Sequence, residues 1–231
     1  MEKTFDIKGC IFDMDGVLTD TAELHFKSWK RFAKQFGFKI PDELNTRLKG
    51  LSRPDSLQII LEYSNQSYSE EAISGMMKLK NDLFLEEVEE FNESDRFPGA
   101  LNFIEELQRE SIPYALASGS RNAVIILEKI GLKHYFEVLL DGNSVKTGKP
   151  DPQIFIKAAE EMGVGDRSRI VVFEYSVAGL SAALKGGFLT VVFGSGSELK
   201  KLAHFTIDDW QGVNLKYIRQ RFSEWEGAIG D

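Results

Sequence analysis

The stretch IKGCIFDMDG, residues 7–16, is the part of the sequence that decides the fold. Its first six residues are mainly apolar, and the run stops abruptly at the acidic loop Asp13-Met14-Asp15-Gly16. A short run of β-branched and aromatic residues that ends at turn residues is typical of a buried strand. We therefore expect a strand at 7–12, followed by a loop that carries two carboxylates.

The same pattern recurs further along the chain. We expect additional strands at 114–117, 138–140, 170–173 and 190–193. Helical patterns lie between them, at 99–110, 122–130, 152–162 and 176–185. This alternation predicts an α/β fold, a parallel sheet with helices on both faces. Such sheets bind ligands at the carboxyl ends of their strands, so the loops after the strands are the places to look for a site.

Residues 19–93 interrupt the alternation and read as helix throughout. An apolar stripe opens this block, formed by Phe26, Trp29, Phe32, Ala33 and Phe36. Further helical patterns follow at 54–63 and 69–91, and an amphipathic helix that serves packing is expected at 213–226. We predict a core of residues 1–18 and 94–231 into which a helical cap domain, residues 19–93, is inserted.

The composition narrows the class of protein. Of 231 residues, 42% are hydrophobic and 28% charged, as in ordinary globular proteins. Basic residues number 28 and acidic residues 36, and the net charge of −8 argues against general binding to nucleic acid or anionic membranes. The single cysteine, Cys10, excludes an internal disulfide and fits a reducing compartment. With no apolar stretch of about 18 residues and no secretory signal, we expect a cytoplasmic protein.

Polar residues follow four of the predicted strands. They are Asp13 and Asp15; Ser118, Gly119 and Ser120; the segment Gly148-Lys149-Pro150-Asp151-Pro152; and Glu174 with Tyr175. Each group alone has an ordinary explanation, such as a helix cap, a turn or a solvated lysine. Their common position at strand ends predicts that they converge in one cleft.

The segments FDMDGVLTD, ASGS, GKPDP and VVFEYSVAG resemble, in this order, the four motifs of the haloacid dehalogenase-like superfamily. Members of this superfamily mostly transfer phosphoryl groups. Four further stretches, DGVLTDTAELHFKSWK, LKGLSRPDSL, KLKND and ASGSRN, resemble the β-phosphoglucomutases within it, and the similarity covers nearly the whole chain. The resemblance implies a Rossmann-like core with a helical cap inserted after the first strand, in agreement with the periodicity.

The resemblance also implies roles for the core residues. Asp13 is the nucleophile that carries the phosphoryl group as an aspartyl-phosphate, and Asp15 is the general acid–base for the sugar oxygens. Lys149 supplies positive charge to the transferring group. Ser118, with backbone N–H groups near Gly119, holds the phosphoryl oxygens.

A magnesium ion is the cofactor that the resemblance implies, held by Asp13, the backbone carbonyl of Asp15 and Glu174. The fourth motif departs from the family here: the usual Glu-Asp-Ser is Glu174-Tyr175-Ser176. The missing aspartate is typically a magnesium ligand. A phenol with a pKa of about 10 stays neutral and replaces a carboxylate poorly, so we expect weakened metal affinity.

The predicted cap carries candidate substrate contacts. His25 resembles the residue that couples cap closure to Asp15, although a lone histidine on an apolar helix face is ordinarily a core or surface residue. Arg53 resembles the arginine that binds the distal phosphate of the substrate. The alternative is that Arg53 is a solvated residue at the start of a helix. Further substrate contacts implied by the resemblance are Gly50, Leu51, Lys80, Asn81, Ser120, Arg121 and Asn122. Arg121 stands where lysine is common.

The leading prediction is a magnesium-dependent β-phosphoglucomutase, a monomer whose partners are sugar phosphates. It would interconvert β-glucose 1-phosphate and glucose 6-phosphate through β-glucose 1,6-bisphosphate. One alternative is a sugar-phosphate phosphatase, which would share the core residues but let water reach the intermediate. The other is a weakly active or inactive relative that binds phosphate or sugar, because of Tyr175.

Overall fold

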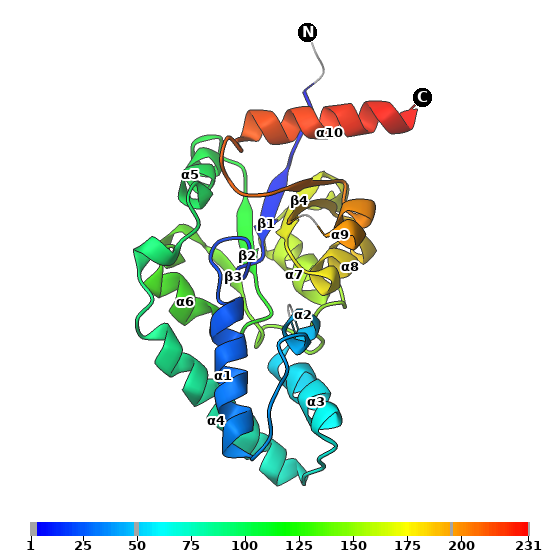
Figure 1. The fold of residues 1–231 in the computed structure, drawn as a ribbon. Helices are drawn as coiled ribbons and strands as arrows, with labels where there is room; N and C mark the ends of the chain where they lie inside the picture. Colours follow the sequence, from blue (N-terminus) through cyan, green and yellow to red (C-terminus); the bar gives the residue numbers. More distant parts are fainter. Residues whose placement is uncertain (1–3, 49–50, 195, 231) are drawn as a thin grey trace.

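The computed structural model describes residues 4–48, 51–194 and 196–230, and its centre is a parallel sheet (Figure 1). The sheet has six strands in the order β3-β2-β1-β4-β5-β6, and all neighbours run parallel. The strands are β1 (Gly9–Phe12), β2 (Tyr114–Ala117), β3 (Val138–Leu140), β4 (Ile170–Glu174), β5 (Leu189–Phe193) and β6 (Phe205–Ile207). The first strand is central, so the loop after it lies at the middle of the carboxyl edge.

Helices cover both faces of the sheet, which confirms the predicted fold class. On one face α5 (Ala100–Arg109), α6 (Ala123–Lys129) and α10 (Leu215–Gly230) share a core with one set of strand side chains. On the other face α7 (Gln153–Glu161) and α8 (Val177–Lys185) pack on the alternate set. The shorter elements of this part are α9 (Ser197–Leu202) and three 3₁₀ helices, η1 (Glu93–Asp95), η2 (Lys133–Tyr135) and η3 (Arg167–Arg169).

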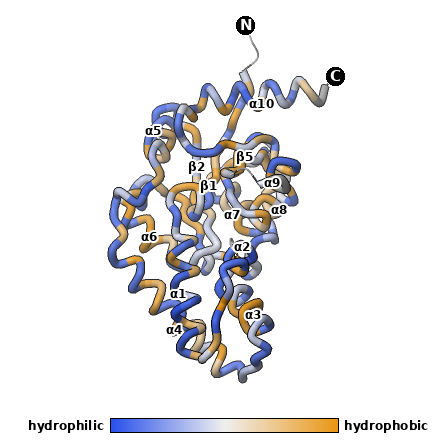
Figure 2. The backbone as a smooth tube through the Cα atoms, viewed as in Figure 1, coloured by the Kyte–Doolittle hydropathy of each residue, from blue (hydrophilic) through white to orange (hydrophobic). Residues whose placement is uncertain are grey.

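The alternation of side chains along β1 explains the two cores. Phe12 belongs to the core under α5 and α10, whereas Ile11 faces α7 and α8. The Phe12 ring stacks on Phe173 with 5.0 Å between centroids, and the Trp210 ring lies 5.1 Å from Phe173. Hydrophobic colours appear in the strands and alternate with hydrophilic colours along the surrounding helices (Figure 2). Burial of these residues supplies the main driving force for this fold.

A second group of helices lies together beyond the carboxyl edge of the sheet (Figure 1). It consists of α1 (Ala22–Gln35), α2 (Leu44–Leu48), α3 (Arg53–Ser64) and α4 (Glu70–Val88). These helices have a hydrophobic core of their own, which includes the buried Phe26, Trp29 and Phe32 of the predicted stripe. The separate core supports an independent helical unit, and the domain boundaries at 18/19 and 93/94 stay a prediction.

The chain crosses between the two units at two adjacent segments. Thr19 pairs with Arg96 in an antiparallel bridge, and its hydroxyl donates to the Asp95 carbonyl at 2.7 Å. The Phe97 amide donates to the Leu18 carbonyl at 2.8 Å. The outgoing and returning chains are therefore tied to each other at the place where cap and core join.

Some elements differ from the sequence prediction. The sequence pattern does not predict the strand β6 or the helix α9. β6 has three residues and α9 has six, and both are too short to give a clear periodic pattern. β1 begins at Gly9 rather than residue 7, since its neighbours begin opposite Gly9 and Cys10. α10 extends to Gly230, beyond the predicted end at 226. None of the helices within the described ranges is long and apolar enough to cross a membrane.

Candidate active site

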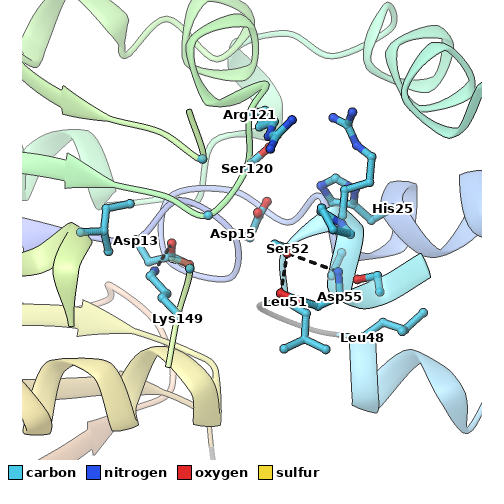
Figure 3. Close-up of a pocket in the computed structure, with 18 of the residues that line it drawn as sticks. Asp13, Asp15, His25, Leu48, Leu51, Ser52, Asp55, Ser120, Arg121 and Lys149 are labelled. Atoms are coloured by element: carbon cyan, nitrogen blue, oxygen red, sulfur yellow. Dashed lines mark hydrogen bonds and ion pairs between the residues drawn. The ribbon is translucent and has the colours of Figure 1, made fainter. Parts of the chain in front are cut away.

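A cleft of about 540 Å³ separates the carboxyl edge of the sheet from the helical unit (Figure 3). Its sheet side is formed by the loops after four strands, which contribute Asp13 and Asp15, Gly119 to Arg121, Gly142 with Lys146 to Pro150, and Tyr175. Its opposite side comes from α1, α3 and α4, with His25, Arg53 and Lys80. The strand ends thus converge as the parallel topology requires.

The structure brings most of the predicted site residues to this cleft. Those that line it are Asp13, Asp15, His25, Leu51, Arg53, Lys80, Ser120, Arg121 and Lys149. Ser118, Asn81, Asn122 and Glu174 lie behind the lining residues and contact them. Gly50 lies outside the described residues.

Lys149 connects two acidic residues at the base of the cleft. Its Nζ donates to Asp13 Oδ1 at 2.8 Å and to Glu174 Oε1 at 2.6 Å, and the three side chains are 3%, 7% and 0% exposed. Burial raises the pKa of Asp13 above its ordinary value, as do Glu174 and Asp15, and Lys149 opposes that rise. Burial disfavours the charged form of Lys149, but the two carboxylates outweigh it and raise the pKa of the amine. The Lys149 side chain is therefore protonated, and its single positive charge compensates one of the two buried carboxylates.

Glu174 is anchored to the start of α8. Its Oε2 accepts hydrogen bonds from the Tyr175 amide at 2.7 Å, the Ser176 amide at 2.9 Å and the Ser176 hydroxyl at 3.1 Å. Ser176 also caps α8, because its hydroxyl accepts from the Gly179 amide at 3.0 Å. A side chain on Gly179 would collide with the Glu174 carboxylate, so a glycine is needed at this position. Both oxygens of Glu174 are thus used inside the protein.

Asp15 stands next to Asp13 and has a different environment. Its Oδ1 accepts a short hydrogen bond from the hydroxyl of Thr21, which is fully buried. Burial raises the pKa of Asp15 to about 6, although the Thr21 hydrogen bond and Lys149 oppose the rise. A carboxyl group with such a pKa can both give and accept a proton near neutral pH.

The partly buried His25 and the buried Lys80 form a pair on the helical side. The Lys80 Nζ lies 2.7 Å from His25 Nδ1, and the imidazole stacks on Phe84 with 3.9 Å between centroids. Burial lowers the pKa of His25, and Lys80 and Arg53 lower it further. Burial and Arg53 likewise lower the pKa of Lys80. The pair is therefore poorly disposed to carry two charges, and the predicted coupling of His25 to Asp15 stays a prediction.

Arg53 and Arg121 place positive charge at another part of the cleft. Arg53 Nη2 donates to Asn81 Oδ1 at 2.6 Å, and Asn122 Nδ2 donates to the same oxygen at 2.9 Å. This shared acceptor links α3, α4 and the start of α6. Burial lowers the pKa of Arg53, as does Arg121. Both arginines line the cleft, and Arg53 donates only to the neutral Asn81 side chain among the described residues, so both guanidinium groups can meet an anion there.

Ser118 lies deeper than the sequence reasoning assumed. It is fully buried, and its hydroxyl accepts a hydrogen bond from the Ser120 amide at 3.1 Å. Its own proton is still available as a donor, and the predicted contact with a phosphoryl oxygen stays a prediction. Ser120, by contrast, lines the cleft directly.

The acidic residues do not fit a magnesium ion in the way that the resemblance implies. Within residues 4–48, 51–194 and 196–230 there is no group of three carboxylate, imidazole or thiol side chains arranged to hold a metal. Both carboxylate oxygens of Glu174 accept hydrogen bonds from protein donors, and one oxygen of Asp13 accepts from Lys149. Tyr175 stands at the position where the resemblance implies a carboxylate. One oxygen of Asp13 and the backbone carbonyl of Asp15 remain from the predicted set.

Sequence reasoning missed several residues of this site. Thr21, which binds Asp15, carries no signal beyond lying close to the acidic loop. Ser52 and Asp55 both line the cleft, and the Ser52 hydroxyl accepts from the Asp55 amide at 3.4 Å. The spacing of a serine and an acid three residues apart before an apolar run could have identified this helix start. Trp29 was assigned to the core alone, yet it also lines the cleft.

Comparison with known proteins supplies independent information. The sequence model of the haloacid dehalogenase-like hydrolase family matches residues 7–187 of this chain. A β-phosphoglucomutase of Bacillus subtilis is 33% identical over 222 residues, which covers 95% of this chain and 96% of that protein. A phosphorylated carbohydrates phosphatase of Thermotoga maritima is 33% identical over 184 residues, or 78% of this chain and 82% of the other. The crystal structure of a β-phosphoglucomutase from Clostridium difficile superposes with a TM-score of 0.89 at 32% identity, covering 95% of this chain and 98% of that one.

Proposed function

This chain belongs to the haloacid dehalogenase-like hydrolase family, and on that premise we propose that it transfers phosphoryl groups on sugar phosphates. Within that class we propose a mutase that interconverts β-glucose 1-phosphate and glucose 6-phosphate through β-glucose 1,6-bisphosphate. Relatives that cover nearly the whole chain support the mutase. Since other relatives are phosphatases, the argument for a mutase must come from the site itself.

The observation that carries the proposal is the presence of two separate positive centres in one cleft. Lys149 lies beside Asp13, and Arg53 with Arg121 lies at another part of the lining. A mutase that works through a bisphosphate must hold one phosphate at the nucleophile and a second one away from it. Guanidinium groups are suited to the second task, because their planar fork matches phosphate oxygens. A phosphatase for monophosphates needs only the first centre.

The chemistry uses the two acids of the first loop. A carboxylate oxygen of Asp13 attacks the C1 phosphorus of β-glucose 1,6-bisphosphate, and the bond between that phosphorus and the sugar oxygen breaks, which leaves glucose 6-phosphate. Asp15 gives its proton to that departing oxygen. In the second half the 6-hydroxyl of a β-glucose 1-phosphate attacks the aspartyl-phosphate while the Asp15 carboxylate takes the proton of that hydroxyl, which forms the bisphosphate again and frees the Asp13 carboxylate. The pKa of Asp15, raised to about 6, suits both directions.

The remaining groups position and protect the reacting atoms. The Lys149 ammonium neutralises charge at the base of the cleft, where burial strengthens its effect. The helical unit covers the other side with His25, Trp29 and Lys80, and such a cover keeps water from an aspartyl-phosphate. The balance between sugar and water as acceptor would then decide between mutase and phosphatase.

Phosphorus NMR tests the proposal. The protein is mixed with β-glucose 1-phosphate and a trace of β-glucose 1,6-bisphosphate, with and without Mg²⁺. A growing glucose 6-phosphate signal is the expected result, and Asp13→Asn should abolish it. Release of inorganic phosphate without isomer would make the protein a phosphatase, and no turnover under either condition would contradict both activities.

Two arginine variants examine the second positive centre. Arg53→Ala should slow isomer formation by at least about tenfold, since a charge-assisted hydrogen bond to a phosphate is worth roughly 1.5–3 kcal/mol. The matched control is Arg47→Ala, because Arg47 is exposed on α2 and does not line the cleft. Equal rates for the two variants would remove the argument for a mutase.

A further inference from the structure

The side chain of Tyr175 packs against the acidic loop that follows β1. Tyr175 follows β4 directly, lines the cleft, and packs its ring against Gly16. A Cβ atom at Gly16 would lie 2.3 Å, 2.4 Å and 2.9 Å from the Tyr175 atoms Cδ2, Cγ and Cβ. Gly16 has a φ of +68°, so it is also in the left-handed region that favours glycine. The aromatic ring and the turn after Asp15 are therefore fitted closely to each other.

This arrangement leaves few oxygen ligands for a divalent cation. Magnesium requires near-octahedral oxygen coordination and usually binds through one or two carboxylates, with waters and substrate phosphate completing the shell. The neutral phenol of Tyr175 supplies no carboxylate. Glu174 cannot turn toward the loop without giving up four hydrogen bonds, one to Lys149, two to amides and one to Ser176. Asp13 has one oxygen that is not bonded to Lys149.

The phenol of Tyr175 also affects the charge near the nucleophile, because it is neutral where an aspartate would be negative. Three carboxylates, those of Asp13, Asp15 and Glu174, surround one ammonium group, that of Lys149. An aspartate in place of Tyr175 would add a fourth negative charge at the same spot. A phenol instead of that aspartate lowers the repulsion that a phosphate group would meet, and so lowers the need for a cation to offset it.

We propose that this cleft binds its phosphate group without a divalent cation, with Lys149 as the cation beside Asp13 and Tyr175 in the place of the missing metal ligand. The proposal rests on the proposed function only in assuming that a sugar phosphate enters the cleft. It concerns the free protein and its phosphate complex, so binding measurements can test it apart from turnover.

Metal binding is measured directly with Mn²⁺, whose free concentration is followed by electron paramagnetic resonance. Tyr175→Asp should bind Mn²⁺ at least about tenfold more tightly than the wild type, the size of effect that changes around metal ligands produce. Tyr175→Phe retains the ring and should resemble the wild type. Tyr63→Asp is the charge-matched control, because Tyr63 is 50% exposed on α3 and lies away from the cleft.

Phosphate binding is measured by calorimetry with glucose 6-phosphate, in EDTA and in excess Mg²⁺. The wild type should show the same affinity in both solutions within about twofold, and Tyr175→Asp should gain at least about tenfold from Mg²⁺. Equal Mn²⁺ affinities of the wild type and Tyr175→Asp would overturn the proposal, as would a tenfold gain of the wild type from Mg²⁺. If none of the proteins bound glucose 6-phosphate, the inference that the cleft binds phosphate without a divalent cation would be wrong. Binding of glucose 6-phosphate in EDTA without turnover in the NMR assay would contradict the proposed function alone.

Discussion

Replacement of Lys149 by methionine should destabilise the fold strongly. The methionine side chain has a similar length but no charge, so Asp13 and Glu174 would lose their common partner. Both carboxylates are almost completely buried, with side-chain exposures of 7% and 0%. Breaking a buried ion pair from one side leaves an uncompensated charge, and such changes cost about 3–5 kcal/mol.

This loss of unfolding free energy corresponds to a decrease in the melting temperature. For a domain of about 150–250 residues each kcal/mol shifts Tm by about 2–4 °C, so a decrease of about 6–20 °C is expected. Scanning calorimetry at neutral pH measures it. Lys78→Met serves as a control, because the Lys78–Asp82 pair on α4 is exposed, with 78% and 47% of the side chains accessible. That exposed pair should contribute less than about 0.5 kcal/mol.

The loss should also depend on pH in a definite direction. Lys149 opposes the rise in the pKa of Asp13, so its removal moves the folded-state pKa further above the unfolded value of about 3.9. An acid whose pKa is raised by folding destabilises the folded state increasingly as the pH rises from the unfolded pKa to the folded pKa, and the penalty is absent below the unfolded pKa. Because Asp13 already has a folded-state pKa of about 8 with Lys149 present, the loss caused by Lys149→Met should be similar at pH near 5 and pH near 7 and should grow as the pH rises above about 8.

A double variant separates the ion pair from simple loss of packing. Lys149→Met combined with Asp13→Asn removes one of the two carboxylates that would lack a cation, and it should recover part of the stability that Lys149→Met loses. A stability loss for Lys149→Met no larger than that of Lys78→Met, or one that does not change with pH, would refute the reasoning.

Two further predictions concern other buried contacts. Thr21→Val removes a hydrogen bond that lowers the pKa of Asp15, so the pH at which Asp15 loses its proton should move upward from about 6, and rate profiles of phosphoryl transfer should shift accordingly. The buried Thr190→Val is the matched control, and an equal shift in both variants would contradict the assignment. Trp210→Phe removes the donor to the Val17 carbonyl at 2.7 Å and should cost about 1–3 kcal/mol in urea unfolding, whereas an unchanged midpoint would mean that this hydrogen bond contributes nothing.

Much of the fold follows from local patterns. Short apolar runs that end at turn residues predict the strands, and β2 and β3 have the predicted bounds. The reason is that burial on both faces of a parallel sheet demands continuous apolar runs, which are visible in the sequence. The apolar stripe of α1 likewise predicts a helix packed on one side, and Phe26, Trp29 and Phe32 are buried as that pattern requires.

The convergence of the strand ends could also be predicted. Asp13 and Lys149 are 136 positions apart in the sequence, yet both follow strands of one parallel sheet. Because all carboxyl ends of such a sheet lie at one edge, topology alone brings the two side chains together. The sequence by itself therefore determines the sheet, the edge that carries the cleft and the residue types found there.

The pairing of individual side chains was decided only by the tertiary structure. The sequence does not indicate that Lys149 lies between Asp13 and Glu174, that Thr21 binds Asp15, or that Lys80 lies against His25. Such contacts join segments that have no common periodicity. They depend on the relative positions of helices and loops at a precision of about an ångström. Hydrophobic burial places the segments, whereas the short range of hydrogen bonds and steric packing selects the partners once the segments have been placed.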